Sequence, residues 1–225
     1  MKKTLLAIFA LTALTATTQA ALIAHWGFDT YTSGDYGPVL PNDGLQGTAG
    51  LTVDSVNVPA NKLNSVAGTT LNDPRTPPNA SQAMQFQGQK ANSGFITIHL
   101  SGTGMDSFTL TYAALRTQSG PENNQWSYSV DGGASFSTVG VGQPGAIGTT
   151  YSILTVDFTG VTALNGAGDI LLRGTPTNAG GGNADYDNFQ VMAAVPEPVN
   201  VALALFGLGI VGLKFGRRLF CFVRG

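Results

Sequence analysis

Charge and cysteine are both scarce in this sequence. Only 11% of its 225 residues are Asp, Glu, Lys or Arg, against roughly 25% in an ordinary soluble domain. This scarcity argues against coiled coils and long solvated helices, which need Glu and Lys in quantity. The single cysteine, Cys221, lies in the C-terminal tail. The central domain therefore has no disulfide, and its stability must come from its hydrophobic core.

The few charges are distributed unevenly along the chain. Six of the 11 basic residues lie in the terminal segments, whereas residues 21–195 hold five basic and 12 acidic residues, a net charge of −7. A domain this acidic repels phosphate backbones, so we expect no nucleic-acid partner. Neutral ligands such as glycans, or cations, suit it better.

The N-terminal segment predicts export. Two lysines at positions 2 and 3 precede an apolar stretch at 4–16, and small residues at Thr18 and Ala20 precede an expected cleavage after Ala20. These three parts are those of a secretory signal peptide, assigned to residues 1–20. We therefore expect the Sec translocon to be a partner and the mature chain to act outside the cytoplasm.

The C-terminal segment, residues 195–225, has three parts in a fixed order. Pro196, Glu197 and Pro198 come first, the apolar run 199–213 follows, and Arg217 and Arg218 end the pattern. The prolines favour an extended stretch outside a membrane. With the snorkelling Lys214 and two further residues, the apolar run predicts a short transmembrane helix at about 199–216. The arginines would keep the C-terminus in the cytoplasm.

This order of Pro-Glu-Pro, apolar helix and basic cluster resembles the PEP-CTERM sorting signal of Gram-negative bacteria. The resemblance implies processing by an exosortase at the inner membrane, passage to the cell surface or extracellular matrix, and association with exopolysaccharide and biofilm. The middle of the chain is similar to β-sandwich domains that precede such tails, through residues 24–29, 126–132 and 187–191. That second likeness implies no chemistry.

Between the two ends the hydrophobic pattern has a period of two residues. In Ser107–Leu115, for example, Phe108, Leu110 and Tyr112 alternate with polar residues. Such alternation, bounded by Gly, Asn, Pro and Ser turns, predicts about ten short strands: 22–28, 51–58, 84–86, 95–100, 107–115, 125–130, 136–139, 151–158, 170–173 and 188–192. We predict an all-β fold, a single antiparallel β-sandwich of jelly-roll type in residues 21–194. Residues 30–50 and 72–79 read as long loops.

The segment Asp185-Tyr186-Asp187-Asn188 is a candidate site with three interpretations. It is a solvated turn, or Asp185, Asp187 and Asn188 bind calcium, or the two carboxylates form a catalytic pair. If the segment is extended, both carboxylates lie on one face, about 6.6 Å apart. Oxygen ligands of this kind suit a hard cation, and the spacing is also near that of inverting glycosidases.

The aromatic residues Trp26, Trp126 and Tyr128 also allow two interpretations. They either stack against sugars or form the large apolar anchors of the core, and the core is favoured. The motif Ser129-x-Asp131-x-Gly133-x-Ser135-Phe136 has the spacing of an Asp-box and predicts a local turn held by the Asp131 carboxylate.

The leading hypothesis is an exported, non-catalytic surface or matrix protein sorted through its tail. The alternative is a carbohydrate-binding module, and a minor alternative is a secreted glycosidase, which needs two facing carboxylates in a cleft.

Overall fold

Ten β-strands and two short 3₁₀ helices make up the part of the chain that the computed structural model describes, residues 19–54, 58–80, 82–91 and 96–195. The elements are β1 (Gln19–Trp26), β2 (Gly50–Val53), η1 (Ala60–Lys62), β3 (Leu63–Val66), β4 (Ala83–Phe86), β5 (Ile96–Leu100), β6 (Asp106–Arg116), β7 (Asn123–Ser129), β8 (Ser152–Asp157), η2 (Thr162–Leu164), β9 (Ile170–Thr177) and β10 (Ala184–Val195).

Residues Ala20–Val195 form one unit. Among the described residues no helix is long and apolar enough to cross a membrane. The predicted signal peptide, apart from its last two residues, and the predicted transmembrane helix lie outside the described residues, as do the sorting-motif residues Pro196, Glu197, Pro198, Arg217 and Arg218.

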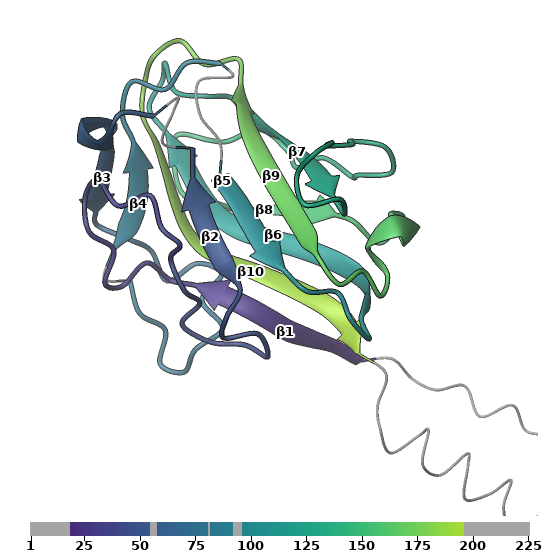
Figure 1. The fold of residues 1–225 in the computed structure, drawn as a ribbon. Coiled ribbons are helices and arrows are strands. Elements are labelled where there is room, and N and C mark those ends of the chain that lie inside the picture. Colours follow the sequence, from purple (N-terminus) through teal and green to yellow (C-terminus); the bar gives the residue numbers. More distant parts are fainter. Residues whose placement is uncertain (1–18, 55–57, 81, 92–95, 196–225) are drawn as a thin grey trace, which may run out of the picture. The chain divides into compact units, whose positions relative to one another are not determined.

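The strands form two sheets. One has the order β3-β4-β10-β6-β8, with β1 also paired to β10, and the other has the order β2-β5-β9-β7. From β5 onward, successive strands alternate between the two sheets (Figure 1). The pairs whose register is resolved are all antiparallel. The prediction of an all-β, antiparallel sandwich is therefore confirmed at this level.

The alternating sequence pattern packs one face of each strand into a shared core. Along β9, residues at every second position are buried, beginning with Ile170. Aromatic rings join the sheets: Tyr112 of β6 stacks on Phe189 of β10 with ring centroids 4.9 Å apart, and Trp126 of β7 donates from Nε1 to the Tyr112 hydroxyl at 3.2 Å. Offset stacking and a satisfied indole N–H are the arrangements that buried aromatic residues prefer.

Two strand predictions were wrong. Residues 136–139 form no strand and make only a single bridge, between Ser137 and Tyr128. Their backbone turns so that the Phe136 ring lies over the Arg173 guanidinium, 3.4 Å from ring centroid to Cζ, a cation–π contact. Conversely β3, with the sequence Leu-Asn-Ser-Val, was missed because it is an edge strand with little hydrophobic alternation. The long loops at 30–50 and 72–79 are confirmed.

The predicted Asp131 turn is confirmed in its local mechanics. The Ser129 hydroxyl donates to Asp131 Oδ1 at 2.6 Å, and the Ser135 backbone N–H donates to the same oxygen at 3.0 Å. Hydrogen bonds from Ser129 and Ser135 hold the pKa of Asp131 well below its usual range. The motif therefore stabilises a local turn and has a structural role.

A bulge in β10 determines where its polar residues point. Asp185 pairs with Leu115 and Asp187 with Ala113 of β6, but the register then shifts before Gln190 pairs with Thr111. Asn188 lies in this shift with φ of 49°, a left-handed conformation that asparagine tolerates better than most residues. The bulge thus turns the Asn188 side chain out of the regular alternation of the strand.

Candidate ligand-binding site

The segment Asp185–Asn188 is part of strand β10, so its interpretation as a solvated turn was wrong. Asp185 and Asp187 lie two positions apart on one face of the strand, as expected for extended backbone. The Gln85 amide of β4 donates to Asp185 Oδ1 at 2.8 Å. Burial raises the pKa of the Asp185 carboxyl, and the bond from Gln85 only partly offsets this effect.

Asp187 and Asn188 hold the loop 67–75 onto the six-stranded sheet. The Thr69 backbone N–H donates to Asp187 Oδ2 at 2.8 Å, while the Asn188 amide donates to the carbonyl oxygens of Thr69 at 2.7 Å and Leu71 at 3.0 Å. Asp187 is only 1% exposed. Burial raises the pKa of Asp187 to about 7, and the nearby charges of Asp29 and Asp73 add to this rise.

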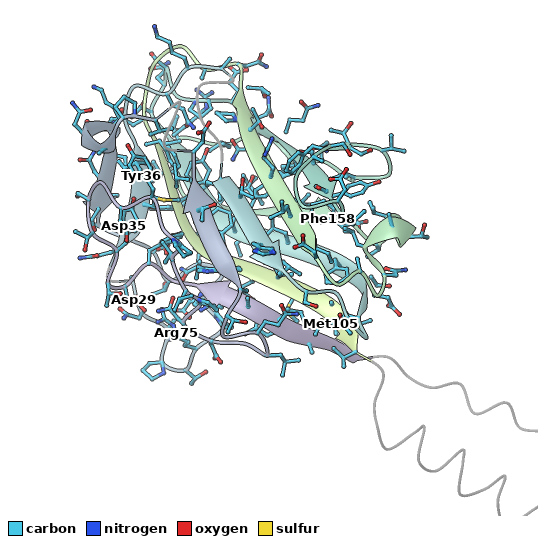
Figure 2. All side chains as sticks on the ribbon, in the orientation of Figure 1. Asp29, Asp35, Tyr36, Arg75, Met105 and Phe158 are labelled. Atoms are coloured by element: carbon cyan, nitrogen blue, oxygen red, sulfur yellow. The ribbon has the colours of Figure 1, made fainter. Side chains whose placement is uncertain are left out.

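Arg75 provides the second attachment of this loop. Its guanidinium pairs with Asp29, three positions after β1, and with Asp73 in the loop, where Nη2 and Oδ2 are 2.7 Å apart. Figure 2 labels Arg75 and Asp29 close together beside β1. Burial raises the pKa of Asp73, but hydrogen bonds from Arg75 and from the Asn79 backbone outweigh it and lower the pKa to about 2. Ion pairing therefore compensates a carboxylate with no exposed side-chain surface.

The calcium prediction for Asp185, Asp187 and Asn188 stays a prediction. Within the described residues no three His, Cys, Asp or Glu side chains cluster closely enough to hold a metal ion. Asn188 Oδ1, one of the predicted ligands, lies 3.2 Å from His25 Nε2. The structure thus gives these residues a role that the sequence did not indicate, which is to fasten a loop.

The interpretation of the tryptophans as core residues is confirmed. Trp26 and Trp126 are fully buried, and Tyr128 packs against the core. The Trp26 indole N–H donates to the Val39 carbonyl at 2.9 Å. Because both tryptophans are buried, the three residues form no joint sugar-stacking platform.

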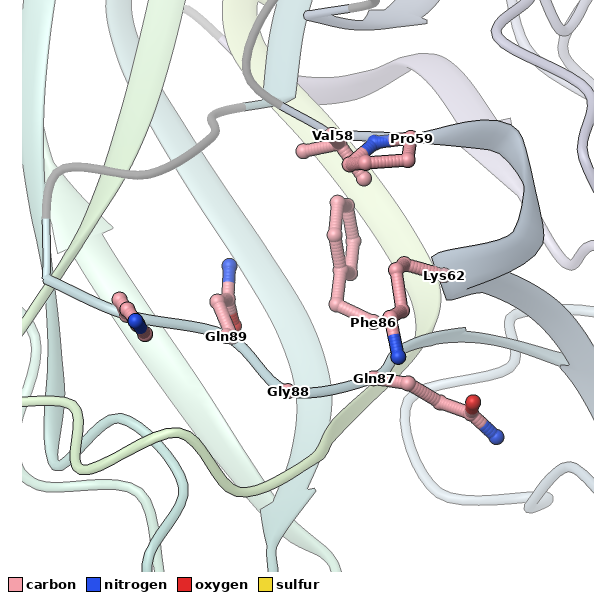
Figure 3. A pocket seen from close by; sticks show the side chains of 8 residues that line it. Val58, Pro59, Lys62, Phe86, Gln87, Gly88 and Gln89 are labelled. Carbon is pink, nitrogen blue, oxygen red and sulfur yellow. The ribbon is translucent and has the colours of Figure 1, made fainter.

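A pocket that the sequence did not indicate lies between the η1 segment and the end of β4 with the turn that follows it, with a volume of about 250 Å³ (Figure 3). Val58, Pro59 and Phe86 give it an apolar wall. Phe86 itself is anchored by an edge-to-face contact with Tyr186 of the core, 5.6 Å between centroids. The apolar wall is thus continuous with the rigid interior of the sandwich.

The polar part of the pocket is built by the turn after β4. Gln89 is 5% exposed, its side chain lines the pocket, and its Oε1 is buried without a hydrogen-bond partner. Its backbone is fixed on both sides, since Gln89 N–H donates to Gly182 O and Gly181 N–H donates to Gln89 O. Leaving a buried amide oxygen without a partner costs about 1–3 kcal/mol, so Gln89 Oε1 retains an unused capacity to accept a hydrogen bond.

Two lysines complete the pocket. Lys62 at the end of η1 and Lys90 after Gln89 both line it, and both side chains are exposed. Figure 3 shows Gln89 reaching from the turn toward the space beneath Val58, with Lys62 on the other side of Phe86. No Asp or Glu is among the described residues that line the pocket. The described lining residues thus offer hydrogen-bond donors and an apolar wall.

Comparison with known proteins yielded no matching family model and no matching curated protein. Among solved structures, the CBM22-1 xylan-binding domain of Paenibacillus barcinonensis Xyn10C aligns with 81% of this chain and 100% of its own, at 11% identity and a TM-score of 0.47. The TmCBM61 module in complex with β-1,4-galactotriose aligns with 73% of this chain and 92% of its own, at 11% identity and a TM-score of 0.41. Likenesses this weak transfer neither a ligand nor a site to this chain.

Proposed function

We propose that this chain is an exported, non-catalytic carbohydrate-binding protein, whose ligand site is the pocket between Val58 and Lys90. The alternation of successive strands between two sheets supports a jelly-roll-like sandwich, a fold used by many lectin domains. The observation that carries the proposal is the pocket itself, in which the buried Gln89 amide lines the same space as the apolar side chains of Val58, Pro59 and Phe86. The solved structures named above do not carry it.

The chemistry of the pocket suits a sugar ring. Apolar side chains accommodate the C–H faces of a pyranose, and an amide both donates to and accepts from hydroxyl groups. The volume of about 250 Å³ is slightly below the range of about 300–1,000 Å³ for drug-sized ligands, so a single ring or a chain end should fill it. The absence of acidic side chains among the described lining residues favours binding over glycoside hydrolysis, which needs two carboxylates.

Replacing Gln89 by leucine should abolish glycan binding while the fold persists. Leucine keeps the volume and removes the unpaired oxygen, so stability should stay within about 1 kcal/mol of the wild type or improve. The full chain, in a detergent without a sugar head group, is tested on a glycan array, with melting curves run in parallel. Gln118→Leu, an exposed amide outside the pocket, is the matched control. A blank array for the wild type, or unchanged binding by Gln89→Leu, would contradict the proposal.

The proposed route to the cell surface rests on the two ends of the chain. Export through the Sec translocon, transient insertion in the inner membrane and processing by an exosortase would deliver the domain to an exopolysaccharide matrix. Replacing Pro196, Glu197 and Pro198 by alanine should leave an uncleaved form in the inner membrane. Mass spectrometry of the released wild-type protein should find a C-terminus near residues 196–198, and a chain ending at Gly225 would refute the processing step.

A further inference from the structure

Strand β7 lies at the end of the four-stranded sheet, next to β9, and a later segment covers most of its free edge (Figure 1). Ser137 exchanges two backbone hydrogen bonds with Tyr128, each 2.9 Å long. The Gln143 amide takes the next place: its Oε1 accepts from the Trp126 N–H at 2.7 Å, and its Nε2 donates to the Trp126 carbonyl at 2.8 Å. Such a cover hides the backbone groups that make a sheet edge able to pair.

The cover is interrupted at Asn124. In an antiparallel pair, the backbone groups of successive residues point alternately toward the partner strand and away from it. Trp126 and Tyr128 bond the cover on the side away from β9, so the N–H and C=O of Asn124 point to that side as well. The next contact of the cover is at Glu122, whose carbonyl accepts from the Ile147 N–H at 2.7 Å. In the part of the chain that the structure describes, residues 137–147 form no hydrogen bond with the Asn124 backbone, so one donor and one acceptor remain at the edge.

A pocket of about 300 Å³ lies at this interruption. Its described lining residues are all uncharged: Asn123, Asn124, Gln125, Gln143, Pro144 and Thr177. The Asn124 side chain points into the core, where its Nδ2 donates to the Tyr112 hydroxyl at 3.4 Å and its Oδ1 accepts from the Tyr186 hydroxyl at 3.1 Å. Asn124 therefore contributes its backbone to the pocket. Pro144 has no N–H with which to pair the Asn124 carbonyl.

We infer that this pocket is a second saccharide site, which binds two neighbouring hydroxyls of an uncharged sugar. One hydroxyl accepts from the Asn124 N–H and the other donates to the Asn124 C=O, in the way that the Gln143 amide engages Trp126. The Pro144 ring offers an apolar contact for the C–H groups of the sugar, and the Gln125 amide can donate to or accept from a further hydroxyl.

The pocket favours a compact neutral ligand. With no charged side chain in the described lining, an ionic ligand would lose its water without gaining a counter-charge. A peptide strand added to the edge needs backbone partners at several positions, but Gln143 and Ile147 already occupy the positions on both sides of Asn124. This site is additional to the one proposed above, because the two pockets share no described lining residue.

The Asn124 amide signal in an NMR titration reports directly on this site. The isotopically labelled full chain, in a detergent without a sugar head group, is titrated with methyl β-glucopyranoside and with methyl 3-deoxy-β-glucopyranoside. The deoxy probe has no two neighbouring ring hydroxyls. We expect the glucoside to shift the Asn124 signal saturably in the millimolar range, and the deoxy probe to bind about tenfold more weakly, as for the loss of one or two hydrogen bonds. Such affinity is too weak for a glycan array to detect, so the array result expected for Gln89→Leu is unchanged.

Two double variants test the side chains of the pocket. Gln125→Ala with Pro144→Ala removes one amide and the apolar ring, and it should weaken glucoside binding about tenfold. Gln118→Ala with Pro78→Ala makes the same substitutions at exposed positions outside the pocket and should have little effect. Equal weakening by both pairs would overturn the inference. Melting curves verify that all variants are folded.

The two saccharide sites fail separately. In Gln89→Leu the glucoside should still shift the Asn124 signal, and loss of that shift would contradict a second site. Equal affinity for the glucoside and the deoxy probe would overturn recognition of neighbouring hydroxyls. An Asn124 signal that does not move with the glucoside would overturn the inference and leave the Gln89 pocket standing, whereas a blank array with an intact Asn124 response would do the reverse.

Discussion

Replacing Arg75 by alanine should lower the free energy of unfolding by about 3–5 kcal/mol, the usual cost of removing one partner of a buried ion pair. The Asp73 side chain has no exposed surface, and that of Asp29 is only 13% exposed. Without the guanidinium, the desolvated carboxylates of Asp29 and Asp73 would remain close to Asp187. Their charges already disfavour the ionised form of Asp187. Tm should fall by roughly 10 °C.

Two companion variants identify the cause of that loss. Arg75→Lys keeps the charge but loses the planar fork that bonds both carboxylates, so it should retain only part of the stability. Arg75→Ala combined with Asp73→Asn also removes one of the two carboxylates left without a partner, so it should recover part of the lost free energy of unfolding. Urea unfolding followed by fluorescence of the two buried tryptophans measures all four proteins. An Arg75→Ala chain within 1 kcal/mol of wild type would show that the loop is held without this ion pair.

The wild-type domain should lose stability relative to Asp187→Asn as pH rises from about 4 to about 7. Aspartate in an unfolded chain has a pKa of about 3.9, whereas burial raises the pKa of folded Asp187 to about 7. In this window the folded state therefore binds more protons than the unfolded state, so raising the pH favours unfolding. A shift of this size corresponds to roughly 2–4 kcal/mol over the full window.

Comparing wild type with variant removes most contributions of other titrating groups near Asp187. The carboxylates of Asp29, Asp73 and Asp185 occur in both proteins. His25 also occurs in both proteins. Burial lowers its pKa, so its effect on the free energy of unfolding has the opposite sign. That free energy falls as pH drops below about 6.5, because the unfolded state then binds the proton more readily than the folded state.

Denaturant unfolding at pH 4.5, 6 and 8 in the presence of a chelator tests the prediction. Asp157→Asn is the control, because Asp157 is exposed and hydrogen bonds from Thr159 lower its pKa. Titration of Asp157 therefore changes the free energy of unfolding only in more acidic solutions. Curves for wild type and Asp187→Asn that stay parallel across this range would contradict a raised pKa. Repeating the wild-type series with millimolar calcium tests the calcium prediction, because a bound cation would stabilise the ionised form.

Much of the strand content could be predicted from the sequence because alternation is a local property. Strands β6 and β7 follow directly from residues such as Phe108, Tyr112 and Trp126, which recur at every second position. Edge strand β3 could not be predicted, since Asn64 and Ser65 interrupt the pattern and its pairing with β4 supplies the extended structure. Phe136 belongs to a turn because Arg173, 37 positions along the chain, offers its ring a cation.

The candidate site shows the same division more sharply. Gly88-Gln89-Lys90 reads as a polar turn, and no local signal marks Gln89 as buried. Its burial follows from backbone bonds to Gly181 and Gly182, more than 90 residues away. For Asp185 and Asp187, the spacing correctly placed both carboxylates on one face, but it said nothing about the loop that covers Asp187.

By itself, then, the sequence determined the all-β class, the approximate positions of most strands and the burial of both tryptophans. These depend on hydrophobic periodicity and side-chain size, which neighbouring residues carry within a few positions. Only the tertiary structure decided that Arg75, Asp73 and Asp187 fasten a loop and that Lys62, Gln89 and Lys90 share a pocket. Burial and charge pairing depend on which distant segments meet, and that meeting results from packing the whole chain around one core.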